Sequence, residues 1–120
     1  MGETEFKNVI GRIRGKFLVR LARQYERSQD LAQDWPRREG SFESLEELCE
    51  IAHKVAGLAK SVGFSDLGLA AFVADSTIRK WLGEQNAEVS EADVTAVIDE
   101  FLAGCSRALD SDREIDPSRS

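Results

Sequence analysis

Residues 48–70 of this 120-residue chain read LCEIAHKVAGLAKSVGFSDLGLA, and their apolar spacing decides the fold. Apolar residues recur at intervals of three and four, which is typical of a helix with one buried face. On a projection of about 100° per residue, one stripe faces the core; it consists of Leu45, Leu48, Ala52, Val55, Ala59 and Val62. His53, the only histidine of the chain, projects about 100° from the middle of that stripe, at the exposed margin of the helix.

The region before this segment also has helical spacing, from Phe6 to Leu31. Gly11 and Gly15 weaken the pattern, because each interior glycine costs about 1 kcal/mol relative to alanine. They predict a short lead helix followed by a longer one. A break follows at residues 35–40, which include a proline and a glycine.

The helix that carries His53 is predicted to start at Ser41 or Ser44 and to stop near Gly63. Ser44 with Glu47 has the spacing of a capping box, in which side chain and backbone at a helix start bind each other reciprocally. Acidic residues in the first turns suit the positive end of the helix dipole. The pattern therefore predicts one helix over residues 41–62.

Two further helices are predicted towards the C-terminus. One runs over residues 65–82 and is closed by Gly83, and the last opens at Ser90 with Asp93 and carries an apolar stripe as far as Leu109. No segment has sustained alternation with β-branched residues, so no strand is needed. The expected fold is all-α: an antiparallel four-helix bundle with an additional short N-terminal helix. Residues 1–110 form the bundle, and residues 111–120 form a polar C-terminal tail that is expected to be flexible.

Composition limits the classes of function. Apolar residues make up 42% and charged residues 32%, as in a globular protein of one domain. The start MGETEFKNVI has neither the basic segment nor the apolar stretch of a signal peptide, and no apolar run reaches the length of a membrane span, so a cytoplasmic protein without membrane contact is expected. The net charge of −6 argues against nucleic acid as the main ligand. The charge is uneven, since residues 1–38 hold nine Lys or Arg against five Asp or Glu.

The surroundings of His53 favour a reactive histidine over an incidental one. Gly57 lies one turn later, and a glycine in mid-helix needs a reason because it lowers helix stability. Its absent side chain gives access to the imidazole. Lys54 and Lys60 could supply positive charge to a phosphate on the ring.

The same residues resemble the signature of histidine phosphotransfer domains. In that family an Ala-His pair is followed by an apolar residue at the second position and by glycines at the fourth and tenth. The matching residues are Ala52, His53, Val55, Gly57, Gly63 and Leu67. The resemblance covers roughly residues 12–109, although only the histidine segment is specific.

Two positions depart from the family pattern. The family usually has lysine at the third position after the histidine, where this chain has Ala56, and a small residue often follows the first glycine, where it has Leu58. Lys54 or Lys60 can take the place of the missing lysine, and the sequence leaves open which. A degenerate domain that binds receivers without transfer remains an alternative.

The resemblance implies that His53 is the phosphorylated nucleophile of a two-component phosphorelay. The donor and acceptor are aspartyl phosphates on response-regulator receiver domains, and a hybrid sensor kinase stands upstream. The receiver supplies Mg²⁺, so the chain itself is expected to need no cofactor and no metal, and to be a monomer. Docking is expected around His53, with Ile51, Leu58 or Phe64 as a modest apolar patch.

Other classes fit the sequence less well. An autonomous histidine kinase needs an ATP-binding domain, for which there is neither a glycine-rich loop nor length. A metal or haem site on Cys49 and His53 lacks further ligands, since Cys105 is distant, and both cysteines are expected to be reduced, partly buried thiols. The main alternative is a non-catalytic helical adaptor in which His53 is incidental.

Overall fold

The computed structural model describes residues 2–35, 41–83 and 86–114, and all regular structure in these ranges is helical. The elements are α1 (Glu3–Asp34), α2 (Ser41–Ala59), the 3-10 turn η1 (Lys60–Val62), α3 (Ser65–Leu82), the 3-10 turn η2 (Asn86–Glu88) and α4 (Glu91–Glu114). The all-α prediction is confirmed for the described ranges.

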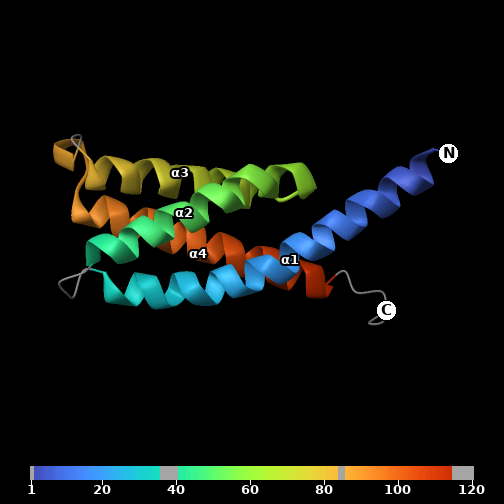
Figure 1. Cartoon of the computed structure of the whole chain (residues 1–120), viewed down its shortest axis with the longest axis horizontal. Helices are drawn as coiled ribbons and strands as arrows, with labels where there is room; N and C mark the ends of the chain where they lie inside the picture. The colour runs from blue at the N-terminus through green and yellow to red at the C-terminus, as the bar shows by residue number, and fades with distance from the viewer. Residues whose placement is uncertain (1, 36–40, 84–85, 115–120) are drawn as a thin grey trace.

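The four long helices lie side by side, and consecutive helices run in opposite directions (Figure 1). Helices α1 and α3 each pack against both α2 and α4, and the contact between α2 and α3 is the most extensive. The N-terminal part of α1 projects beyond the other three helices (Figure 1). This projection accounts for a longest dimension of 53 Å against 27 and 18 Å in the other directions.

The prediction of a separate short N-terminal helix, which was based on Gly11 and Gly15, is wrong. Residues Glu3–Asp34 form one continuous helix, with Gly11 and Gly15 inside it. The two glycines lower the stability of the helix without ending it, because breaking it would cost a second nucleation step. A Cβ at either position would meet no atom of the described residues within 4 Å, so neither glycine is required for close packing against them.

The core is built from the apolar faces that the sequence pattern predicted. All six residues of the predicted α2 stripe are buried. They pack in one cluster with residues of the other helices, which include Leu21 of α1, Ile78 of α3 and Phe101 of α4. Both cysteines are free and buried, Cys49 in α2 and Cys105 in α4. His53 is thereby carried on a helix whose opposite face is fixed in the core.

Helix α2 ends close to its predicted C-terminus. It tightens into η1 and is followed by Gly63 at a φ of +95°, a backbone conformation that favours glycine. The amide of Phe64 then donates to the carbonyl of Ala59 at 2.8 Å, which closes the helix end. Helix α3 has the predicted bounds, and Gly83 follows it.

The predicted starts of the second and of the last helix have different outcomes. Helix α2 already begins at Ser41, so Ser44 lies within its first turns and cannot cap it. Glu47 instead pairs with Arg27 of α1 at 2.6 Å. At the start of α4, the amide of Asp93 donates to Ser90 Oγ at 3.1 Å and the amide of Ser90 donates to Asp93 Oδ2 at 2.9 Å. The two bonds form a capping box and confirm that the last helix opens at Ser90 with Asp93.

The C-terminal boundary differs slightly from the prediction. Helix α4 extends to Glu114, into the expected polar tail, and residues 115–120 lie outside the described residues. The predicted break at residues 35–40 also falls mostly outside them, although α1 does end at Asp34. Within the described ranges, none of the helices combines the length and apolar character that crossing a membrane requires.

The capping box of α4 leads to a stability prediction. Ser90→Ala removes the acceptor for the Asp93 amide and should lower the free energy of unfolding by about 1 kcal/mol. Thr95→Ala is the matched control, because Thr95 is exposed inside the same helix and alanine there should raise stability by a few tenths of a kcal/mol. Urea unfolding followed by circular dichroism measures both. Equal effects of the two substitutions would contradict the assigned role of Ser90.

Candidate functional site

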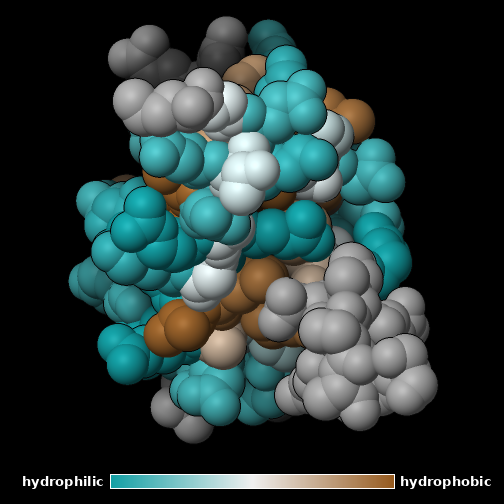
Figure 2. Space-filling model, turned by 90° about the vertical axis from the view of Figure 1, so that its right-hand side faces the viewer, coloured by the Kyte–Doolittle hydropathy of each residue, from teal (hydrophilic) through white to brown (hydrophobic). Residues whose placement is uncertain are grey.

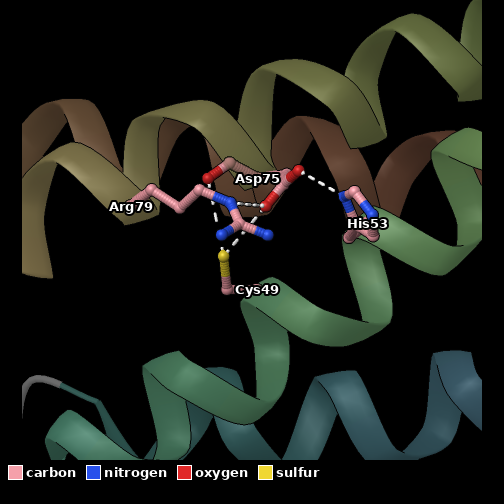
Figure 3. A network of polar contacts seen from close by, with 4 residues as sticks. All are labelled: Cys49, His53, Asp75 and Arg79. Carbon is pink, nitrogen blue, oxygen red and sulfur yellow. Dashed lines mark hydrogen bonds and ion pairs between the residues drawn. The ribbon is translucent and has the colours of Figure 1, made fainter.

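His53 faces an acidic partner across the contact between α2 and α3. Its Nδ1 lies 3.0 Å from Oδ2 of Asp75, which is on α3 (Figure 3). The two side chains differ sharply in burial: 66% of the His53 side chain is exposed, against 10% of the Asp75 side chain. The histidine is therefore tethered at one edge by a buried carboxylate, while the rest of its ring is open to solvent.

Two further side chains hold the same carboxylate. Nε of Arg79, one turn later on α3, donates to Asp75 Oδ1 at 2.7 Å. The thiol of Cys49, one turn before His53 on α2, donates to the same oxygen at 3.0 Å and approaches the Asp75 carbonyl at 3.5 Å. Figure 3 shows Asp75 between Cys49 and Arg79 on one side and His53 on the other. These bonds occupy Oδ1 and leave Oδ2 for the imidazole.

The electrostatics of the network keep Asp75 ionised. Burial raises the pKa of the Asp75 carboxyl, but hydrogen bonds from Cys49, His53 and Arg79 and the charge of Arg79 outweigh it and lower that pKa below its usual range. Burial raises the pKa of the Cys49 thiol to about 12, and its hydrogen bond to the Asp75 carboxylate acts in the same direction. The site at neutral pH thus contains a carboxylate and a protonated thiol.

An ionised carboxylate decides which ring nitrogen of His53 carries the proton. A carboxylate can only accept hydrogen bonds, so Nδ1 donates to Asp75 Oδ2. In the neutral imidazole the other nitrogen, Nε2, then keeps its lone pair. Nε2 is the ring nitrogen turned away from Asp75 in Figure 3. The arrangement presents an oriented nucleophile at the surface of the bundle.

The predicted lysines lie on different sides of α2. Lys60, two turns after His53, lines the groove between α2 and α3 together with Ala56, Gly68 and Phe72. Lys54 follows His53 directly, so its side chain leaves the helix about 100° further round. Both are exposed, and neither forms an ion pair with another described residue. Of the two lysines, only Lys60 therefore lines the α2–α3 groove, whose lining on α2 begins at Ala56, three residues after His53.

The two predicted glycines have different local roles. Gly57 is exposed one turn after His53, and a Cβ there would meet no atom of the described residues within 4 Å. Packing within the chain therefore does not require a glycine at this position, which leaves open space beside the histidine for an approaching molecule. Gly63 acts through the backbone, because its positive φ ends η1 and lets α3 turn back along α2.

The predicted apolar patch is only partly present. Leu58 is exposed, but Ile51 and Phe64 are half-buried against the core. The Phe64 ring stacks on Phe17 at 5.8 Å between centroids and lies beneath the guanidinium of Arg14, which is 4.6 Å from its centroid. The largest exposed apolar side chains beside the α2–α3 groove are instead Leu69 and Phe72 of α3.

The metal interpretation of Cys49 and His53 gains no support from the geometry. No three His, Cys, Asp or Glu side chains in the described ranges are grouped so as to hold a metal ion. The Cys49 thiol instead donates a hydrogen bond to the Asp75 carboxylate at 3.0 Å. Its hydrogen bond to Asp75 gives the thiol a structural use.

Sequence reasoning missed Asp75 and Arg79. Asp75 lies on the buried face of α3 beside Ala71, Ala74 and Ile78, and it is one of two buried polar residues in the described chain. A charged residue on an otherwise apolar helix face is a signal, because burial of a charge is costly unless it is paired. Arg79 four residues later is the matching partner on the same helix.

Asp75 should contribute to stability in a pH-dependent way. Its folded-state pKa lies below the ordinary value of 3.8, so the contribution is present above about pH 4 and is lost as the pH falls through the folded-state pKa. Asp75→Asn should lower the free energy of unfolding at pH 7 by about 1–3 kcal/mol. The difference from the wild type should shrink below about pH 4.

Asp99→Asn is the control for this substitution. Asp99 is exposed and forms no ion pair with another described residue, so its replacement should change stability by no more than about 0.5 kcal/mol. Urea unfolding at several pH values compares the two variants. A pH-independent loss in Asp75→Asn would show that the charge of Asp75 is not what stabilises the site.

Comparison with known proteins finds no relative of this chain. No protein-family model matches the chain, no curated protein matches it, and no solved structure matches it. The geometry of this chain and the short motif around His53 are therefore the observations that bear on its function.

Proposed function

We propose that this chain is a histidine phosphotransfer protein. It accepts a phosphoryl group on Nε2 of His53 from the aspartyl phosphate of a response-regulator receiver domain and passes it to a second receiver. The observation that carries the proposal is the hydrogen bond from His53 Nδ1 to the buried carboxylate of Asp75, with the rest of the ring exposed. An incidental surface histidine would have no need of a partner held in place by Arg79 and Cys49.

The transfer step uses Nε2 as the nucleophile. Its lone pair attacks phosphorus, the new N–P bond forms as the P–O bond to the receiver aspartate breaks, and the aspartate leaves as a carboxylate with the electron pair. The proton on Nδ1 stays in place, so the ring gains positive charge during the step. In the reverse step a receiver carboxylate attacks phosphorus and the imidazole leaves as a neutral group.

Asp75 has two effects on this step. It fixes the tautomer and the orientation of the ring, which holds Nε2 in the position for attack. Its negative charge also stabilises the positive charge that the ring gains, as a buried carboxylate does for the histidine of a hydrolase triad. Arg79 and Cys49 act through Asp75, because they hold Oδ1 and fix the direction of Oδ2.

Lys60 is proposed as the cation that faces the phosphoryl group. It lines the α2–α3 groove beside Ala56, and Ala56 is where the resembling family usually has its lysine. Lys54 leaves the helix on another side. A flexible ammonium group that reaches the phosphoryl oxygens from the groove supplies a charge-assisted hydrogen bond.

Receiver domains are the proposed partners, and a hybrid sensor kinase the upstream source of phosphate. Leu69 and Phe72 are exposed beside the groove and offer apolar contact next to the polar site, as protein interfaces commonly do. The receiver is proposed to supply Mg²⁺, and the chain has no kinase activity of its own. The competing function is an adaptor that binds receivers without transfer, which the absence of a lysine at Ala56 favours.

The central test is transfer of labelled phosphate. Receiver domains from the same organism, charged with labelled phosphate, are incubated with the wild type and with His53→Gln. The wild type should gain acid-labile, base-stable label, and His53→Gln should gain none while keeping its helical circular dichroism spectrum. Binding of a receiver without any label would support the adaptor instead. Label on His53→Gln would place the phosphate on another residue.

The role of Lys60 is tested against Lys54. Lys60→Ala should slow transfer about tenfold, which corresponds to the loss of one charge-assisted hydrogen bond. Lys54→Ala removes the same charge from the neighbouring position and should leave the rate within about twofold. Rapid-quench kinetics with one receiver measure both rates. A larger loss in Lys54→Ala would assign the phosphate contact to that residue.

A further inference from the structure

The projecting part of α1 carries an apolar stripe that nothing in the described chain covers. Phe6, Val9 and Ile13 are 68%, 42% and 44% exposed. They have helical spacing and continue the stripe of Phe17 and Leu21, which are buried in the core. Figure 2 looks at this end of the molecule and shows hydrophobic atoms at the surface among mostly hydrophilic ones. The core-facing stripe of α1 thus runs on beyond the bundle without a partner among the described residues.

Charged residues flank this stripe in a particular order. On a helical projection, Glu5 and Arg12 lie on one side of it and Glu3 and Arg14 on the other. Both pairs share one midpoint along the helix, between Asn8 and Val9. Within the described chain, none of the four takes part in an ion pair.

We propose that the projecting segments of two copies pair antiparallel, with the two-fold axis between Asn8 and Val9. In that register Glu5 of each copy lies opposite Arg12 of the other, and Glu3 lies opposite Arg14. A parallel pair would place Glu against Glu and Arg against Arg, which is unfavourable. The contact is isologous and closes at two copies.

The length of the projection fits this arrangement. The bundle begins near Arg14, where the guanidinium lies over Phe64. The partner helix begins at Glu3, which in the proposed register lies opposite Arg14. Each helix therefore ends where the other bundle begins, so the two bundles do not collide. The paired segment is only about 16 Å long at 1.5 Å per residue. This length predicts a weak, concentration-dependent dimer in place of the monomer that the family resemblance implies.

A second copy fits the segment better than a lipid surface does. Basic amphipathic helices bind anionic membranes through Lys and Arg on their polar faces. The segment also carries four basic residues, Lys7, Arg12, Arg14 and Lys16, but it begins with two acidic ones, Glu3 and Glu5. An anionic surface repels these two, whereas the proposed register pairs them. The acidic first turn is therefore the feature that favours self-association.

The apolar part of the contact is tested with two matched valine substitutions. Val9 lies on the stripe, whereas Val19 is 61% exposed on a different face of the same helix. Sedimentation velocity over a wide concentration range should show a dimer for the wild type and for Val19→Asp. Val9→Asp should be monomeric throughout and keep the wild-type circular dichroism spectrum.

The register is tested by exchange of charge. Glu5→Arg and Arg12→Glu should each raise the dimer dissociation constant about tenfold, because each creates two like-charge contacts per dimer. The double variant restores opposite charges and should return to within about threefold of the wild type. Mutual rescue is specific to an antiparallel pair of identical helices.

Three results would overturn the proposal: a monomeric wild type at every concentration, a dimer that Val9→Asp does not weaken, or a double charge variant that stays weak. Cosedimentation with vesicles of anionic phospholipid separates the membrane alternative. A monomer that binds these vesicles, and loses binding in Val9→Asp, would assign the stripe to a lipid surface.

Discussion

The packing of α2 against α3 is the constraint on which the proposed site depends. Near the end of α2, a Cβ at Gly68 of α3 would lie 3.4 Å from the backbone nitrogen of Lys60, so the two helices approach closely there. Further along the same contact, Asp75 reaches across to Cys49 and His53. A change in the separation or rotation of either helix would break these bonds, because they span only about 3 Å.

The site combines opposite environments within a few ångströms. The buried carboxylate of Asp75 is satisfied by three donors, and such a group resists reorientation because losing a partner would leave a charge poorly solvated. The imidazole it holds is exposed, as a group that must meet another protein requires. The hydrogen-bonded carboxylate of Asp75 orients His53, and the exposed side of the imidazole keeps it accessible.

Much of the fold could be predicted from the spacing of apolar residues, and each wrong prediction has a local cause. The bounds of α3 and the opening of α4 at Ser90 with Asp93 were predicted correctly, because the stop and start signals are short-range. The division of α1 was wrong, since two glycines weaken a helix without breaking it. Ser44 has the sequence of a cap but lies inside α2, where Glu47 forms an ion pair with Arg27 of α1.

The position of His53 at the exposed margin of its helix was predicted from the sequence, but its partner Asp75 was not. Asp75 is 22 residues away, and only the packing of two helices brings the two residues together.

A single spectrum can test whether the phosphoryl group is carried on Nε2 of His53, as expected from the hydrogen bond of Nδ1 to Asp75. The full chain can be phosphorylated with phosphoramidate, a small-molecule donor, and examined by long-range proton–nitrogen NMR of the ring. The predicted result is one phosphohistidine, substituted at Nε2, with the proton retained on Nδ1. A phosphate on Nδ1, or a ring that stays unmodified while other residues are phosphorylated, would contradict the account.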